Sequence, residues 1–255
     1  MLRSANKLRG FKIVAQDEEM GKVRDLYFDD REWIVRYLVV DTGRWLSDRL
    51  VLISPASVDH VGRGDRQLFV WLSKAQVESS PPVETHEPLS RQREREIAAY
   101  YQWPTYWYGD ATFPVPSYVP PITSGSPRSA AHRPSAVLDE EHEGDSHLRS
   151  VSIVTGYFLE TLDDGLGHVD DFLIDDDTWD IRYLVVDTRN WWPGRKVLVS
   201  PRWVDEISWE QSRVRLSLVR ENVKNAPEYN PQRDVERDYE ERLHAHYGLP
   251  VYWKI

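Results

Sequence analysis

The chain has 255 residues, 40% of them hydrophobic and 29% charged, so it can bury a core and lacks the composition of a disordered protein. The absence of cysteine excludes disulfides, thiolate metal sites and a cysteine nucleophile, and it suits a reducing compartment. Residues 1–107 are neutral, residues 108–147 carry −4 and residues 148–255 carry −6, so no segment has the basic surface typical of nucleic-acid binding.

The N-terminal residues have no signal-peptide pattern, and no stretch reaches the ~18 apolar residues of a membrane helix. We therefore expect a soluble, cytoplasmic protein without a membrane span. Residues 1–80 contain closely spaced β-rich runs with tight turns between them, which favours a small antiparallel barrel. In residues 36–42, "RYLVVDT", apolar side chains point to both faces, as in a strand that is covered on both sides.

A helical arm and an aromatic tail are predicted at residues 81–107. Leu89, Ile97 and Tyr101 form its apolar stripe, which Arg93 interrupts. Residues 108–147 are rich in proline and serine and end in acidic residues. This composition cannot bury much surface, so we interpret the segment as an extended, poorly ordered linker.

Residues 148–226 repeat the first 80. "RYLVVDT" recurs at residues 182–188, and the same offset of 146 pairs Leu2-Arg3-Ser4 with Leu148-Arg149-Ser150 without a gap. A period this long indicates two duplicated domains, which we expect to pack as a pseudo-twofold pair.

A second helical arm with an aromatic tail is predicted at residues 227–255. Asn230-Pro231 is interpreted as the N-cap and first helical residue, and Gly248 as the end of the helix. The expected apolar stripe consists of Val235, Tyr239, Leu243 and Tyr247.

Groups with catalytic or metal-binding potential are better explained as structure. Asp41 and Asp187, where a strand ends, are interpreted as turn caps. The acidic pairs and triplets lack the spacing of a calcium loop and are interpreted as solvated turns: Asp29-Asp30, Asp163-Asp164, Asp170-Asp171 and Asp175-Asp176-Asp177.

Residues 165–170, "GLGHVD", lack the third glycine and the following helix of a dinucleotide loop. His244 and His246, two apart on a helix, cannot chelate together. We therefore predict no catalytic residue, no cofactor and no metal site, and a protein that is not an enzyme.

Aromatic residues in loops and tails are the candidates for partner contact. An alternative is that the loop tryptophans fold over a barrel end or pack against the other copy. The candidates are Trp45, Trp191 and Trp192 in loops and Tyr106, Trp107, Tyr252 and Trp253 in the tails.

The run from Gly21 to Val58 and its second copy from Gly167 to Val204 resemble the PRC-barrel domain. This is the β-barrel of the cytoplasmic part of the photosynthetic reaction-centre H subunit, also found in a ribosome maturation factor. The "YxxPxYW" arms resemble those of stand-alone bacterial tandem PRC-barrel proteins. The resemblance implies a mainly β fold of two small antiparallel barrels in tandem.

The same resemblance implies an interaction scaffold that binds protein partners or itself. A ribosome or RNA assembly factor, or an accessory protein like the reaction-centre H subunit that modulates electron transfer, is the alternative. We expect nucleic acid to be an unlikely partner, because the chain has no basic stripe.

Overall fold

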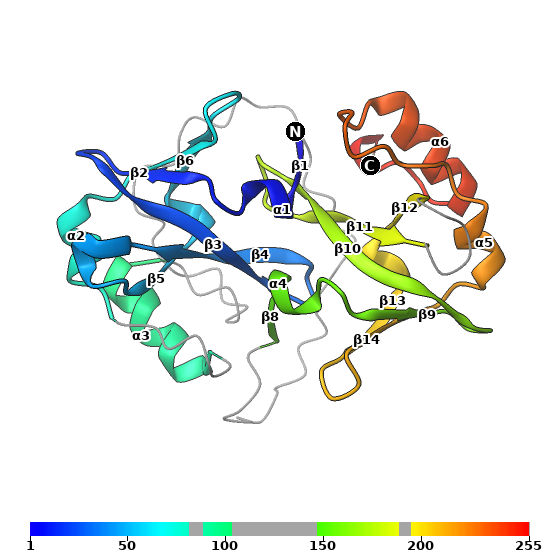
Figure 1. The fold of residues 1–255 in the computed structure, drawn as a ribbon, viewed down its shortest axis with the longest axis horizontal. Helices are drawn as coiled ribbons and strands as arrows, with labels where there is room; N and C mark the ends of the chain where they lie inside the picture. The colour runs from blue at the N-terminus through cyan, green and yellow to red at the C-terminus, as the bar shows by residue number, and fades with distance from the viewer. Residues whose placement is uncertain (82–88, 104–146, 189–194, 255) are drawn as a thin grey trace.

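The computed structural model describes residues 1–81, 89–103, 147–188 and 195–254 (Figure 1). The fold is mainly β, with one sheet in each half of the chain and a few short helices. The first half contains β1 (Leu2–Ser4), α1 (Ala5–Leu8), β2 (Lys12–Val14), β3 (Glu19–Asp29), β4 (Ile34–Asp41), η1 (Gly43–Leu46), β5 (Leu50–Ile53), η2 (Pro55–Ser57), β6 (Val58–Val61), β7 (Gln67–Val70), α2 (Lys74–Glu78) and α3 (Arg91–Tyr101).

The second half repeats this order. It contains β8 (Leu148–Ser150), α4 (Val151–Val154), β9 (Phe158–Glu160), β10 (Gly165–Asp175), β11 (Ile181–Asp187), β12 (Lys196–Val199), η3 (Pro201–Trp203), β13 (Val204–Ser208), β14 (Arg213–Leu216), α5 (Arg220–Lys224), α6 (Arg237–Tyr247) and η4 (Tyr252–Lys254).

The two sheets have the same topology. The first runs β5-β4-β3-β2-β7-β6 and the second β12-β11-β10-β9-β14-β13, with the β2–β7 and β9–β14 pairs parallel and the others antiparallel. Each path is open, because no ladder among the described residues joins its two end strands. The prediction of two closed barrels is therefore not confirmed at the level of backbone pairing.

The two halves exchange their first strands. β1, which begins the first half, pairs with β10 of the second, and β8, which begins the second half, pairs with β3 of the first. In the colours of Figure 1 the blue N-terminal strand lies against the yellow-green β10. Each sheet therefore has seven strands, one of which comes from the other half.

A short bridge on the pseudo-twofold axis also joins the halves. Ile34 pairs with Asp180, and on either side Val35 N–H donates to Trp179 O at 2.9 Å and Ile181 N–H to Trp33 O at 2.7 Å. Phe28 and Phe172 meet beside it with ring centroids 5.5 Å apart. One continuous hydrophobic core therefore extends through both halves.

The repeated "RYLVVDT" segments are β4 and β11, with apolar side chains buried on both faces as predicted. Leu38 and Val40 face the main core, while Tyr37 and Val39 pack in a smaller cluster with Ile97 of α3. The duplication thus repeats a strand between two apolar layers.

The start of the second C-terminal helix was predicted wrongly. α6 begins at Arg237, and its N-cap is Glu236 instead of Asn230. The side chain of Asn230 accepts from Gln232 N–H at 2.9 Å, which makes a local turn that competes with a helix. The helix does end where predicted, with Gly248 as a left-handed C-cap.

Candidate interaction surfaces

Each exchanged strand is held by a buried carboxylate of the other half. Asp25 on β3 accepts from Ser150 Oγ at 2.5 Å, from Ser152 N–H at 3.0 Å and from Ser152 Oγ at 2.7 Å. Asp171, its counterpart on β10, accepts from Ser4 Oγ and from Asn6 N–H. The equivalent aspartate of each half thus binds the strand-to-helix turn at the start of the other half.

An ion pair flanks each carboxylate. Arg149 Nε lies 2.5 Å from Asp30 Oδ2, and Arg3 Nε lies 2.5 Å from Asp176 Oδ2, the equivalent atom in the other half. These four side chains are mostly buried. Such pairs fix the register of the exchanged strands because breaking either one leaves a desolvated charge.

Burial changes the acidity of this interface. It raises the pKa of Asp171, an effect that the hydrogen bond from Ser4 partly offsets. It also raises the pKa of Asp30, against the opposing effect of Arg149 and His147. Desolvation therefore outweighs the stabilisation of the carboxylate charge at both positions.

These contacts correct one interpretation of the acidic runs. Asp29 and Asp171 are buried, and Asp30 and Asp176 pair with arginines of the other half, so these residues are not solvated turns. The partners of Asp30, Asp171 and Asp176 lie well over a hundred residues away in the sequence. Asp29 is buried within its own turn, where it accepts from Arg31 N–H and Glu32 N–H. Asp163 does act in a turn, accepting from Thr161 Oγ1 at 2.9 Å, and it also accepts from Arg220 N–H at the start of α5 at 2.7 Å.

Of the two strand-end aspartates, Asp41 caps its turn as predicted, accepting from Gly43 N–H at 2.9 Å. Asp187 is almost fully buried. "GLGHVD" lies within strand β10 and does not form a loop before a helix.

Trp45 lies on η1 and packs onto its own half. Its indole N–H donates to Met20 O at 2.8 Å, and Lys74 Nζ lies 4.7 Å from the centre of its ring. The side chain is partly buried against the core. This geometry matches the alternative of a loop residue folded over the sheet, and its role in partner contact stays a prediction.

Tyr252 and Trp253 of the second tail fold back on α6 and β11. Tyr252 Oη donates to Glu240 Oε1 at 2.9 Å, and Arg182 stacks on the tyrosine ring at 4.3 Å. Arg237 stacks on Trp253 at 4.2 Å. The other candidates lie outside the described residues: Trp191, Trp192, Tyr106 and Trp107.

Four exposed apolar side chains of the second half are not among the candidates predicted from the sequence. Phe158 is 40% exposed, Leu162 64%, Trp209 36% and Val219 39%. Phe158 lies on β9 and Leu162 just after it, while Trp209 lies in the β13–β14 turn and Val219 just before α5. Hydrogen bonds join these segments, from Phe158 N–H to Ser212 O and from Leu162 N–H to Leu218 O. We call this set the β9 surface.

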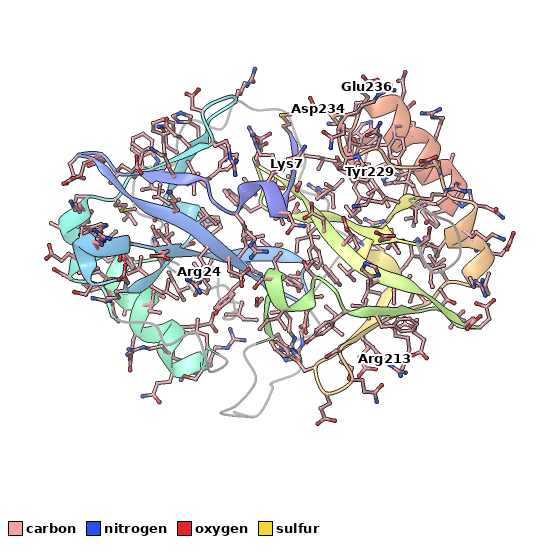
Figure 2. The ribbon with its side chains drawn as sticks, viewed as in Figure 1. Lys7, Arg24, Arg213, Tyr229, Asp234 and Glu236 are labelled. Atoms are coloured by element: carbon pink, nitrogen blue, oxygen red, sulfur yellow. The ribbon has the colours of Figure 1, made fainter. Side chains whose placement is uncertain are left out.

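The first half has polar residues at the positions that match the β9 surface. The offset of 146 places Lys12, Gln16, Arg63 and Ser73 there. A comparison of the two copies could have found this signal in the sequence. The surface carries paired charges as well, since Glu160 lies 3.6 Å from Arg213, which is labelled on β14 in Figure 2. An apolar surface with a charged rim is typical of protein interfaces.

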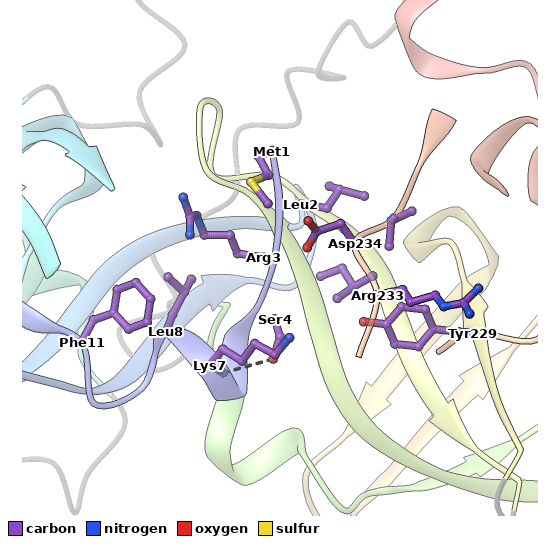
Figure 3. Close-up of a pocket in the computed structure, with 12 residues that line it drawn as sticks. Met1, Leu2, Arg3, Ser4, Lys7, Leu8, Phe11, Tyr229, Arg233 and Asp234 are labelled. Atoms are coloured by element: carbon purple, nitrogen blue, oxygen red, sulfur yellow. Dashed lines mark hydrogen bonds between the residues drawn. The ribbon is translucent and has the colours of Figure 1, made fainter. Parts of the chain in front are cut away.

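A pocket lies where the exchanged segment meets the approach to α6 (Figure 3). Leu2, Leu8 and Phe11 form its apolar side, and Tyr229 and Arg233 lie opposite. Its volume is about 100 Å³, well below the several hundred Å³ usual for small-molecule sites. It can hold a side chain or a few water molecules.

Among the described residues, two groups of aspartate and histidine side chains have oxygen and nitrogen atoms close enough for one metal ion. His168, Asp170 and Asp187 form one, and residues 175–177 form the other. Each already contains a protein cation, because Lys196 Nζ lies 2.6 Å from Asp170 Oδ2 and Arg3 binds Asp176. These cations compete with any metal ion for the carboxylates.

No helix in the part of the chain that the structure describes is long and apolar enough to span a membrane. The family model for the PRC-barrel domain matches the chain twice, at residues 2–76 and 158–222, which together make up more than half of its length. The first match runs from β1 to α2 and the second from β9 to α5, so they cover the two copies of the duplication. A search of curated proteins found no match.

Proposed function

Because the chain belongs to the PRC-barrel domain family, we propose that it is a non-enzymatic scaffold that binds a protein partner through the β9 surface of its second half. The observation that carries this proposal is the set of exposed apolar side chains at positions where the other copy has polar ones. Single differences of this kind also occur in the first half, as at Trp71, but the residues of the β9 surface lie on segments that hydrogen bonds join.

The strand exchange supports an external partner for the β9 surface. The edges of β3 and β10 that an extended segment could join are already occupied by β8 and β1. Self-recognition between the repeats is therefore satisfied within the chain. A further partner has to bind where the copies differ, and the acidic second half favours one with a basic rim.

We further infer that each open sheet works as a small barrel, with its gap filled by side chains and with α3 and α6 as arms over the outer face. Leu52 of β5 and Ile97 of α3 share one apolar cluster, which supports the covering role of the first arm. Leu243 and Tyr247 of α6 are buried in the core of the second. In this reading the arms stabilise the scaffold.

The test is affinity capture from the source cell with the full chain and with the double variant Phe158→Lys/Leu162→Gln. Both substitutions place first-half residues at matching positions, so the sheet should tolerate them. The partner should elute with the unaltered chain and be lost from the variant. Capture of the same protein by both chains would refute the role of the β9 surface.

Trp71→Ser is the matched control, because Trp71 is also exposed and the second half has Ser217 at that position. This variant should retain the partner. Running the capture at low and high salt also separates the alternative, since RNA or ribosomal particles would dissociate steeply with salt. Salt-sensitive RNA in the eluate of all variants would favour an assembly factor.

A further inference from the structure

A buried polar network connects α6 and its tail to β11 in the second half. Tyr183 Oη lies 3.0 Å from Glu240 Oε1 and 2.8 Å from His244 Nε2. His244 Nδ1 lies 2.9 Å from Pro250 O. Glu240 is 2% exposed and Tyr183 also 2%, so water does not supply missing partners.

Counting donors and acceptors shows that this network needs an additional proton. Pro250 O can only accept, so His244 Nδ1 carries a hydrogen. If Tyr183 then donates to Glu240, His244 Nε2 must also carry a hydrogen and the ring is an imidazolium. If Tyr183 donates to His244 instead, the proton between Tyr183 and Glu240 must come from a carboxylic acid.

Both arrangements hold one proton more than a neutral histidine and a carboxylate would. Without this additional proton, one of two contacts has no hydrogen in it: either the contact between the oxygen atoms of Tyr183 and Glu240, or the contact between Tyr183 Oη and His244 Nε2. An unmade hydrogen bond between buried groups costs about 1–3 kcal/mol. The docking of α6 on β11 therefore depends on the protonation of one shared site.

We propose that the second arm is a pH-sensitive latch: one proton shared by His244, Tyr183 and Glu240 holds α6 and its tail on β11, and its loss loosens them. This inference is independent of the proposed partner. The direction follows from the count: above the ordinary pKa of histidine, about 6.5, the released arm has a neutral imidazole and a carboxylate, one proton fewer than the docked arm. Docking therefore keeps its strength near that pH and weakens as the pH rises further and the docked arm loses its shared proton.

The surrounding groups do not replace the shared proton. Tyr252 Oη also donates to Glu240 Oε1, and Arg237 Nη1 lies 3.4 Å from Glu240 Oε2. Arg182 of β11 stacks on Tyr252, and Trp253 packs edge-on against His244. Burial and the charge of Glu240 raise the pKa of Tyr183, so this hydroxyl keeps its own hydrogen.

The first half contains most of this network but lacks the histidine. Tyr37 and Glu94 occupy the equivalent positions, and Glu94 is fully buried beside Arg91 at 2.9 Å. Ala98 stands where the second half has His244. Without an imidazole the additional proton is not needed, so α3 provides an internal reference that should not respond to pH.

The test is hydrogen exchange of the full chain from pH 6 to pH 9, with rates corrected for the intrinsic pH dependence. Protection of the α6 amides should fall roughly tenfold relative to α3, the factor that corresponds to one lost hydrogen bond. A constant ratio of α6 to α3 protection across this range would overturn the latch.

Two variants identify the proton. In Glu240→Gln the amide can donate to Tyr183, which lets a neutral His244 accept, so α6 should stay protected at every pH. His244→Ala restores the first-half residue and should also remove the pH dependence. A fall in protection that persists in both variants would contradict the proposal.

Nitrogen NMR of the histidine ring provides a readout on the unaltered chain, which does not depend on the folding of a variant. The docked arm should show either hydrogens on both ring nitrogens of His244, or a hydrogen on Nδ1 alone together with a protonated Glu240. One proton, from the ring in the first case and from the carboxyl group in the second, should be lost together with the α6 protection. A neutral ring with an ionised Glu240 in the docked arm would contradict the proposal.

Discussion

Asp25 and Asp171 show how single side chains specify the exchange of strands. Each binds a serine hydroxyl and a backbone N–H at the start of a helix that belongs to the other half. A strand of three residues has few ladder hydrogen bonds of its own. The carboxylate adds charge-assisted hydrogen bonds, which are stronger and more directional than neutral ones.

Asp25→Ala should therefore destabilise the chain by about 2–4 kcal/mol, because it leaves the buried hydroxyl of Ser150 and the half-buried hydroxyl and N–H of Ser152 without their charged acceptor. Urea unfolding measures the loss. Asp59→Ala, which removes an exposed carboxylate paired with its exposed neighbour His60, should change the free energy of unfolding by less than about 0.5 kcal/mol. Equal effects of the two variants would contradict the role of Asp25.

The raised pKa of Asp171 makes its contribution dependent on pH. Burial raises this pKa above 3.8, so the folded state binds the proton more tightly than the unfolded chain. The cost of the buried charge is therefore present above the folded pKa and is relieved as the pH falls toward 3.8. Asp171→Asn never carries this cost.

The destabilisation by Asp171→Asn should therefore grow as the pH falls, since the unaltered chain gains stability on protonation and the variant does not. Urea unfolding of both chains at pH 7, 5 and 4 tests this. If the difference in unfolding free energy between the unaltered chain and Asp171→Asn shrinks toward acid pH, the ionised form of Asp171 stabilises the fold and the prediction is wrong.

At the scale of the element, Gly21 and Gly167 are required by the crossing of paired strands. Their φ angles are +150° and +144°, and a Cβ at either position would overlap a backbone carbonyl oxygen, of Asp41 or Asp187. Each glycine comes directly before the residue of β3 or β10 that pairs with the clashing aspartate: Lys22 pairs with Asp41 and His168 with Asp187. This explains why the duplication kept glycine at both positions.

Gly167→Ala should cost about 2–4 kcal/mol, because the clash is with backbone that cannot move without disrupting the β10–β11 ladder. Gly21→Ala should cost about as much. Gly43→Ala is the control, with a positive φ of +62° but open space around the new Cβ, so only about 1–2 kcal/mol is expected. Thermal or urea unfolding ranks the three variants.

The elements that the sequence could predict are those with local causes. The strands at residues 36–42 and 182–188 followed from apolar residues on both faces, and the end of α6 from Gly248. The exchange of Leu2–Ser4 and Leu148–Ser150 between the halves could not be predicted, because a strand of three residues is too short for its sequence pattern to indicate which strand it pairs with. The start of α6 was misplaced because an Asn-Pro pair also suits a turn.

The candidate surface was partly available from the same sequence. Trp45 and Tyr252 were chosen because they are aromatic and lie in loops or tails, yet both make hydrogen bonds within their own half. Phe158 and Leu162 were missed because they lie in or beside a strand, where apolar residues are expected to be buried. Only the comparison with Lys12 and Gln16 marks them as unusual.

At the scale of the whole molecule, the chain is a fused pair in which each half completes the sheet of the other. The exchanged strands, the bridge at Ile34 and the Phe28–Phe172 contact all cross between the halves. A core shared in this way gives neither half a complete set of contacts alone. The two halves should therefore unfold in one cooperative transition.

A disulfide across the bridge tests both the packing and the cooperativity. Ile34 and Asp180 are flanked by the hydrogen bonds of Val35 and Ile181, so they form the non-hydrogen-bonded type of pair, in which Cα atoms lie about 4.5 Å apart. This separation is within the range that a disulfide can close. The chain has no cysteine of its own, so Ile34→Cys/Asp180→Cys can form only this bond within one chain.

The oxidised double variant should run as a crosslinked monomer, while Ile34→Cys/Asp177→Cys, with its second cysteine in the exposed turn beyond the bridge, should not. Because the bond restrains the two halves in the unfolded chain, it should raise the free energy of unfolding by about 2–4 kcal/mol in a single transition. Urea unfolding with and without reductant measures this. Two separate transitions, or a midpoint unaffected by oxidation, would mean that the halves unfold independently and that the exchanged strands do not couple them.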